Sequence, residues 1–416
     1  MTRSTLRIVL VAGEDPGWGG IGTYTVELAH GLVAEGHHVE LALRGWEQDG
    51  VEELDGLTVH RVTVPAPSWR RGTVAMLSRA HVAREAILFS SRVAQLVERL
   101  HRADGVDVVE APEFHASGLA ASLHSRARGG ARRGPIVVAR LHTPTFLTES
   151  LAAEPPTADT RLLERLERAA VHNATIVTAP STAIAAEVAA RWGSALRRRV
   201  QVIPNPIDAD RFRPLDLPVP DPATLLIVGR IERHKGQDVA VEALPAIRSD
   251  VPGARLLLVG ADSELAGGGG SALASLRRRV AALGMPADAL QATGPVERGE
   301  LPRRLARATV CLVPSRFESF GYTCLEAMAC GRPVVASATG GLAEIVNDGH
   351  DGLLVEPEDA PALAHAAISL LSDPQLRETI EHGARATVEQ RFAAPVVARQ
   401  VAALYADAAS ASAGGR

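Results

Sequence analysis

The chain has 416 residues, more than one ordinary hydrophobic core accommodates, so its length predicts two domains. Its formal net charge of -4 at pH 7 gives no general case for nucleic-acid binding, and its hydrophobic fraction of 46% is that of a globular protein. No apolar stretch reaches the length of a membrane span and no signal-peptide h-region opens the chain, which favours a cytoplasmic location.

Apolar strand-like runs alternate with helical patterns through the first half of the chain. This alternation is typical of parallel sheets built from βαβ units. The strands expected there span residues 6–11, 39–43, 106–109, 136–141, 175–178 and 200–203. The helices expected there span residues 23–35, 74–101, 160–170 and 182–192.

A glycine-rich segment, GWGGIG at residues 17–22, lies between the first strand and the first helix and contains Gly19 and Gly20. It matches the dinucleotide fingerprint G-x-G-x-x-G, and Glu40 stands where that motif has its ribose-binding acid. An NAD(P)-dependent oxidoreductase is therefore one alternative. However, residues 14–16 separate the strand from the first glycine, whereas in the fingerprint the glycine follows directly. The glycines equally fit a backbone loop that approaches another ligand, or a structural tight turn.

Four polar side chains follow two of the expected strands at their carboxyl ends: His142, Glu110, Glu113 and His115. Ligands gather at these ends in open α/β sheets. His142 is the candidate for binding a sugar hydroxyl or steadying the reacting centre, and the other three are weaker acceptor-side candidates. A structural role fits each of them as well.

The stretch from Arg70 to Arg102 carries seven arginines against Glu85 and Glu98, with apolar residues between them. Such a pattern fits a basic amphipathic surface for an anionic acceptor or for peripheral contact with a membrane. A solvated helix face is the commoner outcome of the same pattern.

Prolines crowd the middle of the chain, and residues 205–222 are expected to be an interdomain linker. The βαβ alternation then restarts, with strands expected at 224–228, 255–259, 291–293, 310–313 and 333–336. Helices are expected at 238–248, 271–283, 300–307, 324–330, 342–346 and 360–371. The D-x-D pair Asp208 and Asp210 lies in the proline-rich stretch, where capping of a turn is its expected role.

Only one of the 44 lysine and arginine side chains is a lysine, Lys235. A position that stays lysine against such a bias favours a compact ammonium over a planar guanidinium. Lys235 and Arg230 follow the strand expected at 224–228, where two cations are well placed to hold a diphosphate. The alternative is a solvated loop lysine.

Glu318 and Glu326 stand with seven residues between them, about two helical turns, so they are expected to share one face. The free amides of a helix N-terminus between them would form an anion seat, because the helix dipole also favours negative charge. An acid, an anion seat and a second acid suit a nucleotide-sugar: Glu318 for sugar hydroxyls, the amides for the diphosphate and Glu326 for the ribose. The residues expected at that seat are Ser319, Phe320, Gly321, Tyr322 and Thr323.

Two further loops follow strands of the second half. The segment that ends at Val296 is a candidate for offering backbone groups to a nucleobase, and Gly340 and Gly341 are candidates for supporting a phosphate. Plain turns into the next helix explain both loops equally well.

These residues together resemble the family-4 retaining glycosyltransferases of the GT-B fold, most strongly over residues 226–357. The E-x7-E motif of that family matches Glu318 and Glu326. Its arginine–lysine pair matches Arg230 and Lys235.

The first half carries the rest of the resemblance. The family's N-terminal glycine loop matches Gly19 and Gly20, and its acceptor-side histidine matches His142. Its linker signature resembles residues 202–205, although the glycine that usually follows is Pro206 here. Residues from about 391 to 407 resemble the family's last helix, which crosses back to the first domain.

The resemblance implies an α/β protein of the GT-B fold, with two Rossmann-like parallel-sheet domains facing a central cleft. Residues 1–204 with the crossing helix would bind the acceptor, and residues 223–390 would bind the nucleotide-sugar. The implied reaction transfers a hexosyl or N-acetylhexosaminyl group with retention, from a UDP-sugar in preference to a GDP-sugar, to an acceptor hydroxyl. No cofactor or metal is expected, because Arg230 and Lys235 would neutralise the departing diphosphate. A non-catalytic nucleotide-sugar binder and, less favoured, a sugar-nucleotide epimerase of similar fold are further alternatives.

Overall fold

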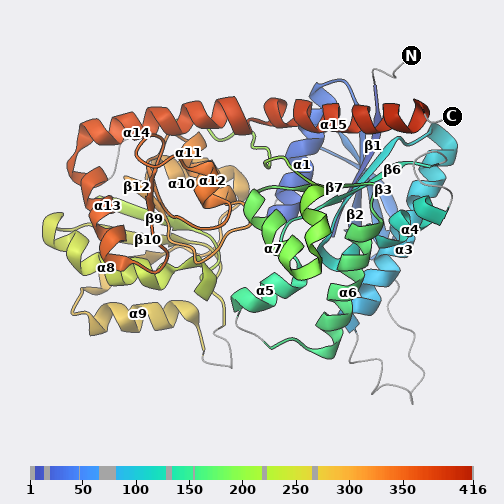
Figure 1. Ribbon diagram of the computed structural model, residues 1–416. Helices are drawn as coiled ribbons and strands as arrows, with labels where there is room; N and C mark the ends of the chain where they lie inside the picture. The colour runs from blue at the N-terminus through green and yellow to red at the C-terminus, as the bar shows by residue number, and fades with distance from the viewer. Residues whose placement is uncertain are drawn as a thin grey trace. The chain divides into compact units, whose positions relative to one another are not determined.

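The computed structural model describes residues 5–13, 19–45, 47–64, 81–127, 134–152, 155–217, 223–264 and 270–414. The chain forms two compact units: Met1–Ser150, Pro155–Pro206 and Ala394–Arg416 make the first, and Ile207–Ala393 with Leu151–Glu154 make the second. Each unit is a mostly parallel sheet with helices packed on it, and the colours of the sheets run from blue to green in the first unit and from yellow-green to orange in the second (Figure 1). Two parallel-sheet α/β domains, the fold class expected from the sequence, are therefore confirmed.

The boundary between the units differs from the expected one. Within the described part of the stretch expected to be a linker, Ile207 and Phe212 are fully buried in the core of the second unit. Asn205, in contrast, accepts a hydrogen bond from Arg140 of the first unit at 2.6 Å. The chain thus passes from one unit to the next at Pro206, because the large apolar side chains between the prolines are buried. Asp208 caps the local turn as expected, accepting from the amides of residues 210 and 211.

The first unit contains an eight-stranded sheet of order β3-β4-β2-β1-β5-β6-β7-β8, parallel except between β3 and β4. Its strands are β1 (Arg7–Ala12), β2 (His38–Gly45), β3 (Gly50–Leu54), β4 (Leu57–Thr63), β5 (Val108–Pro112), β6 (Ile136–Arg140), β7 (Ile176–Ala179) and β8 (Val200–Val202). Its helices are α1 (Gly19–Ala34), α3 (His81–Asp104), α4 (Leu119–Ala127), α5 (Thr145–Ala152), α6 (Ala158–Asn173), α7 (Thr182–Trp192) and α15 (Ala394–Gly414).

Opposite faces of this sheet carry different helices. Val109 and Ala111 of β5 face the core formed with α3. Glu110, between them, points to the other face, where it meets Tyr24 of α1 and Tyr405 of α15. The two helices pack so closely that a Cβ on Gly31 would lie 2.8 Å from the Ala398 Cβ. The C-terminal helix therefore belongs to the first unit.

The second unit contains a six-stranded sheet of order β11-β10-β9-β12-β13-β14, in which every paired strand is parallel. Its strands are β9 (Thr224–Val228), β10 (Arg255–Val259), β11 (Leu290–Ala292), β12 (Val310–Val313), β13 (Val334–Ser337) and β14 (Leu353–Val355). Its helices are α8 (Gln237–Asp250), α9 (Ala272–Ala282), α10 (Leu301–Ala306), α11 (Tyr322–Ala329), α12 (Leu342–Ile345), α13 (Ala360–Ser372) and α14 (Pro374–Thr387). One core joins the sheet to α8, α9 and α13, and another joins it to α10, α11 and α14.

Both strand orders contain a point at which the chain changes direction across the sheet. In the first unit it lies between β1 and β5, and in the second between β9 and β12. Loops that leave neighbouring strands on opposite sides of such a point leave space between them, and ligands of open α/β sheets bind there. The loops after β9 and β12 carry Lys235 and Glu318. In the described ranges, no helix is both long enough and apolar enough to cross a bilayer.

Candidate donor site and acceptor-side residues

The loops after β9 and β12 bring Lys235 and Glu318 into contact. The Lys235 Nζ lies 2.7 Å from the Glu318 Oε1, and the Ser315 hydroxyl donates to the same oxygen at 2.9 Å. The lysine side chain is 20% exposed and the glutamate side chain 13%. Burial raises the pKa of Glu318, but the Lys235 ammonium and the Ser315 hydroxyl outweigh it, so this pKa lies below its ordinary value. The site therefore contains a charged pair, partly withdrawn from water.

Glycines allow the backbones around this pair to pack closely. Gly236 follows Lys235 with φ 68°, and a Cβ there would lie 1.9 Å from the Pro314 carbonyl oxygen. A Cβ on Gly340 would lie 2.1 Å from the Glu318 carbonyl oxygen, and the Gly341 amide donates to that oxygen at 2.8 Å. The Gly340–341 turn thus holds the Glu318 backbone, and the Gly341 amide is not offered to a phosphate as the sequence suggested.

The helix that follows Glu318 begins at Tyr322, with Gly321 as its N-cap at φ 115°. Glu318 therefore precedes the helix and Glu326 lies inside it, as the sequence indicated, so the two do not belong to one helical face. Gly321 contributes no side-chain cap, and the N-terminus of a helix attracts anions through its amides and dipole. Together with Ser319 and Phe320, these positions form the loop and first turn where the anion seat is expected.

Glu326 lies inside α11 and is only 3% exposed. Its Oε1 accepts a hydrogen bond from Arg298 Nη1 at 2.7 Å, and the Arg298 guanidinium also lies over the Phe212 ring at 5.0 Å. Arg298 stands two residues after Val296, so the loop expected beside the nucleobase also carries the partner of Glu326. Sequence reasoning missed Arg298, because no spacing rule links it to an acid 28 residues later.

Arg230 is placed differently from Lys235. Its side chain is 69% exposed, and its Nη2 lies 3.1 Å from Glu232. The structure therefore brings Lys235 and Glu318 together, whereas Arg230 extends into solvent at the same end of β9. An exposed guanidinium of this kind is free to reorient toward an anionic ligand.

In the first unit, His142 lies just beyond β6 and is 7% exposed. Its ring packs edge-on against Tyr24, with centroids 5.1 Å apart. Burial, with a contribution from Arg140, holds the pKa of His142 well below its ordinary value. The imidazole is therefore neutral at physiological pH and suited to hydrogen bonding, without a charge.

Glu113 and Glu167 hold the loop that carries His142. Glu113 is fully buried and accepts the His142 amide with both oxygens at 2.8 Å. Glu167, also fully buried, accepts from the Thr145 amide and hydroxyl and from the His115 amide. These contacts give Glu113 a structural role and argue against the direct acceptor contact expected from the sequence.

His115 adopts a left-handed backbone, with φ 55°, and stacks on Phe114 at 4.1 Å. Burial lowers the pKa of His115 to about 4, and the charge of Arg44 adds to the effect. Glu110 is buried, with one oxygen bonded to Tyr24 and the other to Tyr405. Glu110 therefore joins α1 and α15 to the sheet and is not presented to an acceptor.

Gly19 and Gly20 form the first turn of α1, because this helix begins earlier than expected. The preceding residues 14–18, which include Gly17 of the fingerprint, lie outside the described residues. Glu40, the acid that a dinucleotide would require, lies near the start of β2 and contacts His60. In that motif the ribose-binding acid lies at the carboxyl end of the strand, where ligands bind. The position of Glu40 therefore argues against the oxidoreductase interpretation.

Two family models match the chain almost end to end. The model of Glycosyltransferase Family 4 matches residues 18–211, and the model of Glycosyl transferases group 1 matches residues 210–387. A D-inositol 3-phosphate glycosyltransferase of Catenulispora acidiphila is 32% identical over 389 residues, 88% of this chain and 86% of the relative. This protein belongs to glycosyltransferase family 4.

Solved structures agree with this membership. Sucrose-phosphate synthase from Thermosynechococcus elongatus matches with a TM-score of 0.73 at 26% identity, covering 98% of this chain and 100% of that one. HepE of Anabaena, solved in complex with UDP and glucose, matches with a TM-score of 0.69 at 21% identity, covering 96% and 99%. The resemblance inferred from the sequence is confirmed for the family and for the GT-B fold, and it removes the oxidoreductase alternative.

This family-4 chain should become less stable as the pH rises from about 7 to about 8, whereas at lower pH the lowered pKa values of His115 and His142 oppose this trend. Burial raises the pKa of Glu113 to about 8 and that of Glu167 to about 7, from an ordinary 4.5. Between these values, the two carboxyls therefore hold more protons in the folded state than in the unfolded state. Stability is present in full below the unfolded pKa and is lost as the pH rises through the folded one, at up to about 1.4 kcal/mol per pH unit for each carboxyl.

Urea unfolding at several pH values measures this slope. Glu113→Gln should flatten it, because one of the carboxyls with a raised pKa is removed. Glu187→Gln, at an exposed position on α7, is the matched control and should leave the slope unchanged. Equal slopes for wild type and Glu113→Gln would contradict the prediction.

Proposed function

We propose that this family-4 glycosyltransferase is a metal-independent retaining hexosyltransferase. It transfers a hexosyl or N-acetylhexosaminyl group from a nucleoside-diphosphate sugar, UDP in preference to GDP, to a hydroxyl of an acceptor. The observation that carries the proposal is the 2.7 Å contact between the Lys235 ammonium and the Glu318 carboxylate at the switch point of the second sheet.

Each group has a role in this reaction. Lys235 stabilises the negative charge that grows on the departing diphosphate, and Arg230 can swing to the same anion from its exposed position. The amides at the start of α11 bind the phosphates, because the helix N-terminus favours anions. Glu318 orients sugar hydroxyls, and the ion pair with Lys235 keeps it ionised for accepting them.

The ribose is assigned to Glu326. Its carboxylate accepts a hydrogen bond from Arg298 at Oε1. Arg298 fixes the carboxylate and, through its stacking on Phe212, joins it to the core of the second unit. Val296, two residues earlier, places backbone groups beside the base.

We base the proposal of retention on family membership and on the partners of the Glu318 and Glu326 carboxylates. A covalent glycosyl-enzyme requires two carboxyl groups about 5 Å apart around the anomeric carbon. Glu318 forms an ion pair with Lys235, and Glu326 forms one with Arg298. In this proposal Glu318 binds the sugar and Glu326 the ribose, so the two do not flank the anomeric carbon. Attack of the acceptor hydroxyl on the face that the diphosphate leaves gives retention without such an intermediate. NMR of the product's anomeric proton tests this point, and an inverted product would refute it.

Lysine and arginine side chains supply positive charge for the leaving group, which supports a reaction without a metal. In the part of the chain that the structure describes, no group of three or more His, Cys, Asp or Glu side chains is arranged to hold a metal ion. Turnover should therefore persist in EDTA. Loss of turnover in EDTA, restored by Mg²⁺ or Mn²⁺, would overturn metal independence and leave glycosyl transfer intact.

The acceptor is assigned to the first unit, where His142 offers a neutral imidazole at the end of β6. The names of the relatives make D-inositol 3-phosphate the first acceptor to test. A basic membrane-facing surface from Arg70 to Arg102 stays a prediction, since residues 65–80 lie outside the described residues. An acceptor screen should also include inositol, lipid-linked sugars and polysaccharide ends.

Two measurements test the proposal in sequence. UDP should protect the protein against heat more than GDP, and NAD should give no protection. UDP should then be released from UDP-glucose or UDP-N-acetylglucosamine when an acceptor is present. Protection by UDP without turnover of any donor would favour the non-catalytic binder, and absence of protection by any nucleotide would refute the donor site.

Arg298→Ala should raise the donor KM about tenfold and leave kcat within about threefold. Ribose contacts are equally strong in the ground state and the transition state, so losing the partner of Glu326 weakens binding without slowing the chemistry. Arg303→Ala, an exposed arginine on the neighbouring α10, is the matched control. A fall in kcat with an unchanged KM would show that Glu326 does not bind the ribose.

A further inference from the structure

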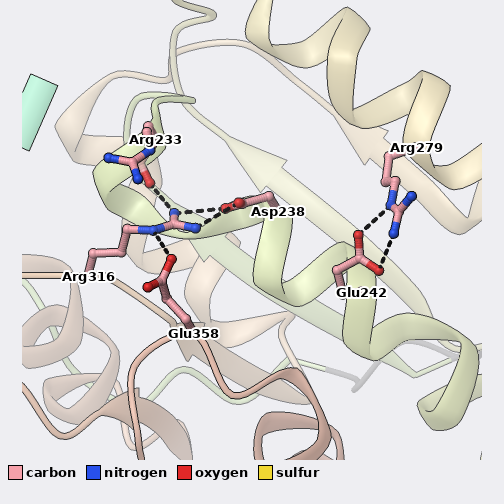
Figure 2. A network of polar contacts seen from close by, with 6 residues as sticks. All are labelled: Arg233, Asp238, Glu242, Arg279, Arg316 and Glu358. Carbon is pink, nitrogen blue, oxygen red and sulfur yellow. Dashed lines mark hydrogen bonds and ion pairs between the residues drawn. The ribbon is translucent and has the colours of Figure 1, made fainter. Parts of the chain in front are cut away.

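A third residue, Arg316, connects the loops that carry Lys235 and Glu318. It stands two positions before Glu318, and its backbone amide donates to the His234 carbonyl at 2.8 Å. Its Nη1 also donates to the Arg233 carbonyl (Figure 2). Both carbonyls belong to the short turn that ends at Lys235, so one residue of the β12 loop contacts two consecutive residues of the β9 loop.

The Arg316 guanidinium is also bound by two carboxylates. Nη1 and Nη2 donate to the two oxygens of Asp238, at 3.0 and 2.8 Å, and Nε donates to Glu358 at 2.7 Å. Arg316 itself is 17% exposed, whereas Asp238 is 51% and Glu358 60% exposed. Bidentate pairing fixes the plane of the guanidinium. Arg316 therefore ties together the start of α8, the β12 loop and the segment between β14 and α13.

The backbone at Glu358 is strained for a side-chain-bearing residue. Its φ is 64°, in the left-handed region that glycine prefers. Strain of this kind persists only where the surrounding contacts over-determine it. Glu358 makes its contact with Arg316 from this left-handed position.

We propose that Arg316 is a positioning residue for the glycosyl transfer proposed above. By joining the Arg233–His234 carbonyls to the β12 loop, it sets the separation of the Lys235 ammonium and the Glu318 carboxylate. It does not act on the donor directly, because its Nε, Nη1 and Nη2 are all engaged by protein oxygens. Asp238 and Glu358 hold the Arg316 guanidinium in place through their carboxylates.

The chain offers a matched control on the same helix. Arg279 of α9 forms a bidentate pair with Glu242, one turn after Asp238 on α8 (Figure 2). Both pairs anchor an arginine to α8 through a carboxylate. Arg316 contacts the carbonyls of the Lys235 turn, so the comparison separates a general effect on α8 from an effect on the donor site.

The test compares Arg316→Ala with Arg279→Ala in the full chain, using the donor and acceptor that the wild type turns over. We expect Arg316→Ala to lower kcat about tenfold to hundredfold, because small misplacements of reacting groups are costly, with the donor KM within about threefold. Arg316→Lys should not restore kcat, since one ammonium cannot reproduce a bidentate fork. Arg279→Ala should keep kcat within about twofold of wild type. Equal kcat values for the two alanine variants would overturn the proposal.

Hydrogen exchange provides a readout that does not depend on activity. Amides of residues 233–236 should exchange faster in Arg316→Ala and at the wild-type rate in Arg279→Ala. If the wild type turns over no donor, the proposed function fails, and exchange alone then decides whether Arg316 positions the turn. Unchanged exchange would overturn the positioning role.

Two milder variants keep the inference testable if Arg316→Ala does not fold. Glu358→Gln and Asp238→Asn each remove one charge at a largely exposed position, and both should lower kcat in the same direction by a smaller factor. Full kcat and wild-type exchange at residues 233–236 in both variants would overturn the proposal.

Discussion

Replacing Lys235 with alanine is expected to lower kcat about 10²- to 10³-fold. Lys235 is the cation that contacts Glu318, and removal of one preorganised charge-stabilising donor has an effect of this size in other enzymes. The effect should fall on kcat more than on the donor KM, because the charge on the diphosphate is largest in the transition state. Steady-state kinetics with the preferred UDP-sugar measures both parameters.

Stability has to be separated from catalysis in this variant. Without the ammonium, the Glu318 carboxylate, 13% exposed, loses its counter-ion, and we expect a loss of about 1–3 kcal/mol. Arg332→Ala is the control, since Arg332 is 16% exposed and lies 3.6 Å from Glu381, next to the start of β13. It should show a comparable fall in Tm with kcat unchanged. A kcat for Lys235→Ala within threefold of wild type would remove Lys235 from the catalytic groups.

Lys235→Arg distinguishes a general need for charge from a need for this side chain. Lys235 packs its Cδ and Cε against Gly229, within 3.9 Å of where a Cβ there would lie, and its ammonium reaches Glu318 by a short path. A longer, planar guanidinium cannot occupy the same position. We expect Lys235→Arg to recover only part of the lost rate. Full recovery would mean that the single lysine of the chain is not required for its compact charge.

The sequence predicted the buried strands from their apolar runs, and it predicted that the chain divides into two βαβ halves. The predicted bounds of β9, β10 and β12 coincide with the observed ones, because strands covered on both faces are continuous apolar runs. The β3–β4 hairpin was missed, since β3 is mostly exposed and carries adjacent glutamates. Its Asp55-Gly56 turn, with φ values of 50° and 79°, was the available signal.

Local sequence spacing identified the loops of the candidate site, but not the partners within it. Arg298 and Arg316 meet their carboxylates only after strands far apart in the chain become neighbours. The sequence also did not reveal which acids are buried. Glu110 and Glu113 look accessible in the sequence, but in the structure Glu110 accepts a hydrogen bond from a tyrosine and Glu113 accepts one from the backbone of a loop. The assignment of sugar, phosphate and ribose to single residues stays a prediction.

Glu318→Gln is the second substitution for which we expect a large effect, a fall in kcat of about 10²-fold or more. Glutamine keeps the size of the side chain and one acceptor for the Ser315 hydroxyl, so the loop should stay folded. The lost negative charge leaves Lys235 without its ion pair and the sugar hydroxyls with a weaker acceptor. Glu381→Gln, the matched acid at the Arg332 pair, should leave kcat within about twofold.

The two substitutions should not be additive, because the residues touch. If Lys235 and Glu318 act as one unit, the double variant Lys235→Ala/Glu318→Gln should be about as slow as the slower single variant. Each single variant leaves a charge without its partner, whereas the double variant removes both, so its Tm should exceed that of Lys235→Ala. Fully multiplicative losses in kcat would show two independent contributions and would break the link between this ion pair and the leaving-group chemistry.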